Sequence, residues 1–90
     1  MWELRITRQF KKDLKKYQNR ADKIASLSIV LSMLQETGSV SSKHKPHMLA
    51  GEYKGFMECH VENDLLLIWL DDTEHIIKLV RLGTHSELFR

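Results

Sequence analysis

The sequence has little cysteine and no long apolar segment. Its single cysteine, Cys59, excludes an internal disulfide, and a small domain without disulfides fits a reducing compartment. The longest apolar run, residues 65–70, is far shorter than the roughly 20 residues of a membrane span. The first residues lack the basic and then apolar order of a signal peptide. We therefore expect a soluble cytoplasmic protein that makes no membrane contact.

Linkers, internal repeats and low-complexity segments are also absent from the sequence. The chain has 90 residues, of which 42% are hydrophobic and 29% are charged. This composition excludes a disordered or collagen-like chain and predicts a single domain over residues 1–90. A chain of this length hides roughly 60% of its unfolded surface, so we expect a thin core.

The net charge of +2 conceals an uneven distribution. Residues 1–23 carry eight basic and three acidic side chains, whereas residues 57–90 carry three basic and seven acidic ones. The basic segment suggests a polyanion or an acidic protein as a partner. The alternative is a solvated helix face with no partner.

Apolar spacing in the first half of the chain predicts one strand followed by two helices. Alternating apolar residues indicate a strand over residues 2–6. Thr7 stands where a helix N-cap is expected, and i, i+4, i+7 spacing follows it over residues 8–19. A second helix is predicted over residues 22–36, with Gly38 just past its end.

From about residue 53 the pattern becomes strand-like. Residues 57–62 alternate between a core-facing set (Met57, Cys59, Val61) and a set that faces the other way (Glu58, His60, Glu62). Asn63-Asp64 fits a hairpin turn, and residues 65–70 are apolar on both faces, as in a central strand. Asp71-Asp72 predicts another turn before a last strand over residues 75–82.

The predicted fold class is α+β, with the element order β-α-α-β-β-β. Residues 38–47 are expected to be a loop, and residues 84–90 a tail after Gly83. Short turns between the last three strands imply antiparallel neighbours. We expect a four-stranded, mostly antiparallel sheet with the two N-terminal helices packed on one face.

Histidine is frequent, with five residues in the chain. Four of them lie near predicted strand ends or loops: His47, His60, His75 and His85. They could be surface residues without a function. A second interpretation is a metal site, because His44 and His47 have the His-x-x-His spacing of metal ligands, although no cysteine or second close pair completes a tetrahedral set. The third interpretation is acid–base chemistry without a metal, because the ordinary pKa of histidine lies near neutrality.

RNA is a substrate that suits several convergent histidines. Its 2′-hydroxyl is an internal nucleophile, already close to the phosphorus atom. The protein then needs only to deprotonate this hydroxyl, protonate the leaving 5′-oxygen and stabilise the phosphoryl charge.

Three segments of the sequence resemble the YafQ branch of the RelE toxin superfamily, the small toxins of bacterial type II toxin–antitoxin pairs. The segments are PHMLAGEYKG (residues 46–55), ECHVENDLL (58–66) and RLGTHSELF (81–89). The resemblance implies the RelE-like fold and a ribosome-dependent mRNA endoribonuclease that uses no metal or cofactor and leaves a 2′,3′-cyclic or 3′ phosphate and a 5′-hydroxyl.

The resemblance also indicates the site residues. The catalytic residues of the family correspond to His47, His60, Asp64 and His85, and its supporting residues correspond to Glu58, Arg81 and Phe89. Lys54 is a further candidate for contact with phosphate.

Roles for these residues are hypotheses. His85 is our choice as general acid, and either Asp64 or His60 as base. His47 and Arg81 would stabilise phosphoryl charge. Glu58 would orient His60, and Phe89 would either stack on a base or pack the tail onto the sheet.

Two other functions fit the same fold. A ParE-like toxin would bind a DNA-handling enzyme without catalysis, although such a binder has no need of His47, His60, Asp64 and His85. An RNA-binding module would use the basic helix without cleaving. The resemblance further implies as partners the ribosome with its mRNA and a cognate antitoxin, whose complex with the toxin would bind operator DNA.

Overall fold

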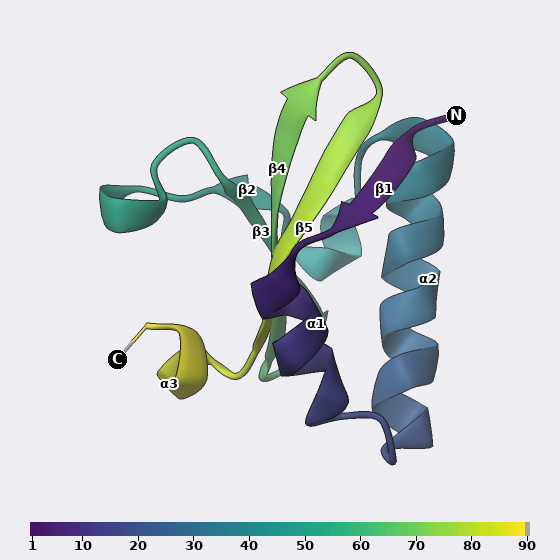
Figure 1. The fold of residues 1–90 in the computed structure, drawn as a ribbon, viewed down its shortest axis with the longest axis vertical. Helices are drawn as coiled ribbons and strands as arrows, with labels where there is room; N and C mark the ends of the chain where they lie inside the picture. The colour runs from purple at the N-terminus through teal and green to yellow at the C-terminus, as the bar shows by residue number, and fades with distance from the viewer. Residues whose placement is uncertain (90) are drawn as a thin grey trace.

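The sheet has five strands rather than the four expected, in the order β1-β5-β4-β3-β2 (Figure 1). The computed structural model describes residues 1–89, and Arg90, the end of the predicted tail, lies outside the described residues. β1 runs parallel to β5, and the other neighbours are antiparallel. The strands are β1 (Glu3–Ile6), β2 (His47–Met48), β3 (Met57–Glu62), β4 (Leu65–Thr73) and β5 (Ile76–Gly83).

Two helices, α1 (Arg8–Lys15) and α2 (Ala21–Thr37), pack against one face of the sheet, as predicted. The Thr7 hydroxyl caps α1 by accepting from the Phe10 N–H at 3.2 Å, and it donates to the Leu79 carbonyl of β5 at 2.8 Å. α1 ends earlier than the predicted residue 19. The reason is that the N–H groups of residues 16–18 bond to carbonyls three residues back, which tightens the chain into a turn.

Both faces of the sheet are covered by apolar side chains, as the apolar strand over residues 65–70 predicted. The main core lies between the sheet and the two helices and includes Phe10, Leu27, Val30, Leu34, Cys59, Leu67, Trp69 and Leu79. A smaller core on the opposite face comprises Leu66, Ile68 and Leu88, with Leu49, Tyr53, Phe56, Val80 and Phe89 around it. The chain segment over residues 49–56, which contains a short 3₁₀ helix (Gly51–Tyr53), and helix α3 (His85–Leu88) cover this second face.

The predicted turn at Asp71-Asp72 is wrong. β4 continues through both residues, and the chain reverses at Glu74 and His75, where His75 takes a φ of 60°. Both aspartates are exposed at the open end of the ladder, and Asp72 meets Lys78 Nζ at 3.3 Å. Partial burial raises the pKa of Asp71, and the ion pair with Lys78 offsets the partial burial of Asp72.

The tail after Gly83 is partly helical, which the sequence reading missed. Thr84 caps α3 through its hydroxyl, which accepts from the Glu87 N–H, and the Glu87 carboxylate accepts from the Thr84 N–H at 2.8 Å. The sequence Thr84-x-x-Glu87 is the signature of such a capping box.

Glu62 faces the helices, whereas the alternation predicted that it faces the opposite side of the sheet together with Glu58 and His60. The register shifts between His60 and Glu62, so the last residue of β3 turns to the other side of the sheet. There its carboxylate accepts from Lys23 Nζ and from Ser26 Oγ, both on α2.

Within residues 1–89, no helix has both the length and the apolar character needed to cross a membrane.

Gly38 ends α2 with a φ of 75°, and its N–H donates to the Leu34 carbonyl at 2.8 Å. We expect Gly38→Ala to lower the free energy of unfolding by about 2 kcal/mol or more, measured by urea denaturation. The left-handed conformation alone costs alanine about 1–2 kcal/mol, and the new Cβ would also lie 2.5 Å from Trp2 Cε2.

Gly51 provides the matched control, because its φ is 70° and a Cβ there would meet nothing within 4 Å. Gly51→Ala should show only the conformational cost. Equal losses in the two variants would contradict the contribution of Trp2.

Candidate active site

One row of paired residues crosses four strands on the face opposite α1 and α2. His47 of β2 pairs with Glu58 of β3, and Glu58 pairs with Ile68 of β4. Ile68 pairs in turn with Arg81, because a bulge at Val80 shifts the register of β5 by one residue. The bulge thereby places a cation on the same face as an imidazole and a carboxylate.

The remaining predicted catalytic residues lie at one end of this row. His60 faces the same side two positions along β3, and through β4 it is aligned with Gly83 at the end of β5. Asp64, in the β3–β4 turn, accepts a hydrogen bond from the His85 backbone N–H at 3.0 Å. The structure therefore gathers all four on one side of the sheet, from segments far apart in the chain.

Glu58 is the least expected group in the row, because its carboxylate is buried with only 5% of the residue exposed. Its Oε1 lies 3.1 Å from His47 Nε2, and its Oε2 has no hydrogen-bond partner. The imidazole that Glu58 contacts is thus His47, rather than His60 as the sequence suggested.

Two contacts hold the ring of His47. Its Nδ1 lies 2.9 Å from the Lys45 carbonyl, which can only accept, so Nδ1 donates this hydrogen bond. Its Nε2 faces the buried Glu58 carboxyl group. The two contacts together fix the orientation of the imidazole plane beside Glu58.

Arg81 is fixed from the helix side of the sheet. Its Nε donates to Asp13 Oδ2 at 2.8 Å and its Nη2 to Asp13 Oδ1 at 3.3 Å. The hydrogen bond with Asp13, supported by Tyr53, raises the pKa of Arg81. Arg81 therefore supplies a permanent and oriented positive charge.

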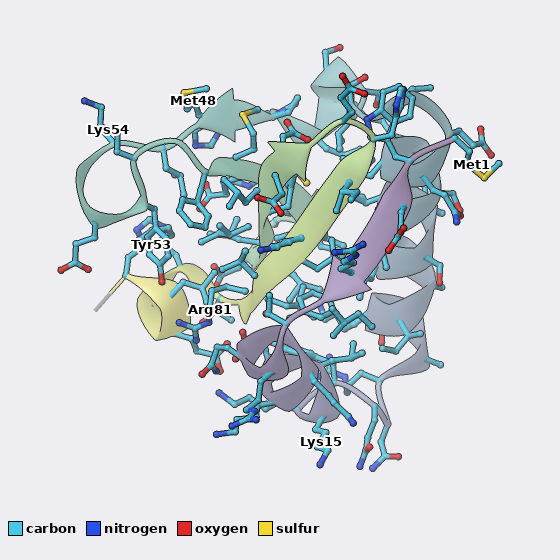
Figure 2. All side chains as sticks on the ribbon, turned by 45° about the horizontal axis from the view of Figure 1, so that its top comes forward. Met1, Lys15, Met48, Tyr53, Lys54 and Arg81 are labelled. Carbon is cyan, nitrogen blue, oxygen red and sulfur yellow. The ribbon has the colours of Figure 1, made fainter. Side chains whose placement is uncertain are left out.

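An aromatic cluster flanks the row on the α3 side. The Phe89 ring lies 5.1 Å from His85 and 5.9 Å from Tyr53 between ring centroids. Figure 2 shows Tyr53 reaching from its loop toward α3. Phe89 is half-buried against the second core and also lines a hollow of about 310 Å³ with Ala50, Glu52, Tyr53 and Leu88. Its ring can therefore pack the tail and still offer a face to a ligand.

A second hollow, of about 250 Å³, lies beside His60 and the β3–β4 turn. The 3₁₀ turn Ser42–His44 and the following residue form one wall, and Lys43, His44 and Lys45 line it. The only carboxylate that lines it, Glu62, is already bonded to Lys23 and Ser26. The free charge of this hollow is therefore positive.

Several other predictions concern single residues. Lys54 is exposed and points outward from its loop, away from Tyr53 (Figure 2). His44, the first residue of the His44-x-x-His47 spacing, is half-buried, and its Nδ1 donates to the His60 carbonyl at 2.8 Å. Cys59 is buried as predicted, and burial raises the pKa of its thiol to about 12, so the thiol is unreactive. Among residues 1–89, no group of three His, Cys, Asp or Glu side chains could hold a metal ion.

Asp13 and Tyr53 are the site residues that sequence reasoning missed. Asp13 lies in a lysine-rich helix 68 residues from Arg81, and no short-range pattern links the two. A sequence signal for Asp13 did exist, since it is an acid between the apolar positions Phe10 and Leu14 of a basic helix.

Comparison with known proteins finds similar sequences over nearly the whole chain. Residues 2–90 match the model of a family described as the bacterial toxin of type II toxin–antitoxin system, YafQ. The mRNA interferase toxin YafQ of Escherichia coli is 32% identical over 88 residues, which cover 97% of this chain and 95% of that protein.

Solved structures are similar over the same length. YafQ in two crystal structures of the E. coli DinJ-YafQ complex has a TM-score of 0.84 at 31% identity. One match covers 100% of this chain and 100% of that YafQ chain. The other covers 99% of this chain and 98% of that YafQ chain. A metal-bound toxin from Helicobacter pylori has a TM-score of 0.85 at 37% identity, with 99% of this chain and 100% of that chain covered. The chain therefore belongs to the YafQ family of toxins from bacterial type II toxin–antitoxin systems.

Proposed function

We propose that this toxin is an mRNA endoribonuclease that acts on the ribosome and cleaves by attack of the RNA 2′-hydroxyl on the adjacent phosphorus. The observation that carries the proposal is the gathering of three histidines, two carboxylates and a fixed arginine on one side of the sheet. These groups can donate, accept and neutralise charge around one phosphate. Relatives that are named mRNA interferase toxins support the choice of substrate.

The reaction needs two proton transfers. A bond forms between the 2′-oxygen and phosphorus while the bond from phosphorus to the 5′-oxygen breaks. A base takes the proton of the 2′-hydroxyl, and an acid gives one to the 5′-oxygen, so the products are a 2′,3′-cyclic phosphate and a 5′-hydroxyl. The added negative charge of the phosphoryl group must be stabilised in between.

His60 is our choice as the base, and His85 as the acid. One oxygen of Asp64 already accepts from the His85 N–H, so this carboxylate holds the start of α3 in place. A carboxylate is also an intrinsically weaker base than an imidazole. His47 and Arg81 would stabilise the phosphoryl charge, since each has N–H donors and is held in place by a carboxyl group, Glu58 for His47 and Asp13 for Arg81.

The RNA strand would lie across the row, between the two hollows. On one side, Phe89 and Tyr53 offer aromatic faces to a base. On the other side, the lysine-lined hollow beside His60 offers positive charge to a flanking phosphate. The exposed basic residues of α1, Arg8, Lys11, Lys12 and Lys15, add charge suited to ribosomal RNA (Lys15 in Figure 2).

Replacing Lys43 and Lys45 together with alanine should raise the KM for ribosome-bound mRNA about tenfold and leave kcat within about twofold, because neither lysine contacts the reacting atoms. The dependence of KM on salt should also become shallower, by a slope of about one for each lost phosphate contact. Lys54→Ala is the comparison: Lys54 is exposed and points outward from its loop, so this variant shows how far the loss of one surface lysine alone raises KM. A fall in kcat with no change in KM would contradict a binding role for the hollow.

The function itself is tested with purified protein and ribosomes that carry a defined mRNA. Mapping the cut ends should show a 2′,3′-cyclic or 3′ phosphate upstream and a 5′-hydroxyl downstream. The same mRNA with a 2′-deoxy nucleotide at the cut position should stay whole, because the nucleophile is gone. Intact wild-type mRNA would favour a non-enzymatic toxin or an RNA-binding module instead.

A cognate antitoxin is the expected protein partner, by analogy with the YafQ that is solved in complex with DinJ. We expect the complex with this antitoxin to bind its operator DNA. The cytoplasm, where ribosomes translate, is the expected location.

A further inference from the structure

Asp13 is a buried charge on an otherwise basic helix. Only 1% of the residue is exposed. Its Oδ2 accepts from Arg81 Nε at 2.8 Å and from the Leu82 N–H at 2.9 Å. Its Oδ1 accepts from Arg81 Nη2 at 3.3 Å and from Gln9 Nε2 at 3.0 Å. Burial alone would raise the pKa of Asp13, but the hydrogen bonds from Arg81 and Leu82 lower it, so the carboxylate stays ionised.

These contacts fix both the guanidinium and the backbone beside it. Asp13 occupies the Nε–Nη2 edge of Arg81 and also bonds to the next residue of β5, immediately after the bulge. A guanidinium has five donors in a rigid plane, so once one edge is occupied the other donors have a set direction. The donors that Asp13 leaves free, beside which Tyr53 also lies, suit contact with a phosphate.

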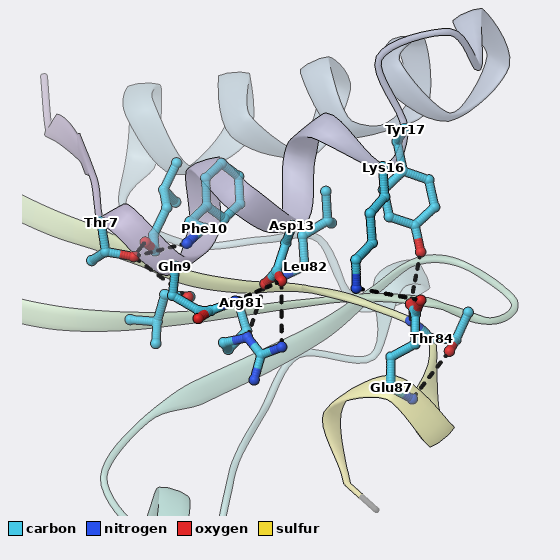
Figure 3. Close-up of polar contacts among 12 residues, drawn as sticks. Thr7, Gln9, Phe10, Asp13, Lys16, Tyr17, Arg81, Leu82, Thr84 and Glu87 are labelled. Carbon is cyan, nitrogen blue, oxygen red and sulfur yellow. Dashed lines mark hydrogen bonds and ion pairs between the residues drawn. The ribbon is translucent and has the colours of Figure 1, made fainter.

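A second contact, made by the turn that follows α1, reaches α3. The Tyr17 hydroxyl, four residues after Asp13, donates to Glu87 Oε1 at 3.0 Å, and Lys16 Nζ lies 3.8 Å from Glu87 Oε2. Burial and the neighbouring Glu87 raise the pKa of Tyr17 to about 12, so its hydroxyl remains a donor. Figure 3 shows the two contacts side by side along α1 and the turn that follows it.

Glu87 is also half of the capping box that encloses His85. It accepts from the Thr84 N–H, while its own N–H donates to the Thr84 hydroxyl. A Cβ at Gly83 would lie 2.9 Å from Glu87 Oε1, so the carboxylate sits directly over the end of β5. The hydrogen bond from Thr84 lowers the pKa of Glu87, which keeps it charged for Tyr17 and Lys16.

We infer that α1 and the turn that follows it position the two ends of the active site: Asp13 orients Arg81 toward the phosphate, and Tyr17, through Glu87, fixes the turn that presents His85. Neither Asp13 nor Tyr17 touches the substrate, so both are positioning residues. The inference rests on the proposed ribonuclease function.

The test is a pair of double-mutant cycles measured by single-turnover cleavage of ribosome-bound mRNA. Asp13→Asn should lower the cleavage rate about 10- to 100-fold, the scale of a group displaced by about 1 Å, with KM nearly unchanged. The amide keeps the volume but points N–H groups at the donors of Arg81. In an Arg81→Gln background the same change should cost less than about threefold, because its target is gone.

The second cycle uses Tyr17→Phe, which removes only the hydroxyl. It should lower the rate several-fold in the wild type and have no effect in a His85→Ala background. Gln18→Ala, an exposed neighbour whose side chain makes no hydrogen bond within residues 1–89, is the control and should cleave normally. Thermal melting of every variant separates loss of fold from loss of rate.

Two results would overturn the inference. In the first, the Asp13→Asn variant melts at a lower temperature but, where folded, cleaves mRNA at the wild-type rate. In the second, Asp13→Asn lowers the cleavage rate equally in the wild-type and Arg81→Gln backgrounds; a merely structural role of Asp13 predicts either result. If the wild-type protein leaves mRNA whole, the proposed function fails first and the inference fails with it. The wild-type arm therefore distinguishes the two failures.

Discussion

His85→Ala should lower the rate of mRNA cleavage on the ribosome at least about 100-fold, the usual scale for loss of a general acid. The His85 N–H is held by Asp64 at 3.0 Å, and its ring lies against Phe89. The ring is exposed, so alanine leaves no buried cavity and the fold should be unaffected. The cleavage rate should fall while ribosome binding is kept, which single-turnover kinetics and a binding assay measure separately.

The leaving group provides a second readout of the same variant. If His85 donates the proton to the 5′-oxygen, an mRNA with a 5′-thio leaving group, which needs no protonation, should recover most of the rate lost in His85→Ala. His75→Asn is the matched control, because His75 lies at the far end of β5, against Trp2, in a left-handed conformation that asparagine tolerates. Full activity of His85→Ala would remove this residue from the mechanism.

Local signals in the sequence predicted most of the fold. The side chain of Thr7 and the freedom of Gly38 each act within four residues of their positions, so capping rules locate the start of α1 and the end of α2. Alternation over residues 57–61 identified β3 and its buried face, and that face is the one that packs on the helices.

The wrong predictions concern features that leave no periodic pattern of apolar residues in the sequence. β2 has only two residues, His47 and Met48, and exists because β3 offers them an edge. A bulge adds one residue to a strand and thereby reverses the face of the sheet on which every later side chain of that strand lies. The bulge after His60 turned Glu62 to the helix side.

The candidate site shows the same division. Histidine frequency and the three matching segments named its histidines, Asp64, Glu58 and Arg81, and the sheet register brings their side chains to one face. The contacts that hold them could not be predicted, because Asp13 and Tyr17 meet Arg81 and Glu87 across 68 and 70 residues. Such pairs depend on how α1 packs on β5, which no local pattern encodes.

Glu58→Leu should make the protein more stable and the enzyme slower. A carboxylate that is 95% buried with one unpaired oxygen loses hydration that a single contact to His47 does not restore. Replacement of a buried ionic group with an apolar side chain of similar volume is often stabilising by about 1–4 kcal/mol. Leucine would also extend the second core beside Ile68, with which Glu58 is paired.

Activity should move in the opposite direction. Without Glu58, His47 loses the partner that orients its ring toward the phosphate, so we expect cleavage to fall about 10- to 100-fold. Urea denaturation and single-turnover cleavage measure the two effects on the same samples. Glu58→Gln, which keeps the shape and a hydrogen bond but not the charge, separates orientation from electrostatics.

The outcome shows why the chain keeps the Glu58 carboxylate, whose burial lowers the stability of a small core. His47 has about half of its side chain exposed, so removal of Glu58 leaves it hydrated rather than stranded in the interior. A loss of stability in Glu58→Leu would therefore mean that the carboxylate supports the fold. A gain in stability with undiminished cleavage would mean that His47 needs no counter-charge. Stability gained with cleavage lost would identify Glu58 as a group retained for its chemistry at the expense of the fold.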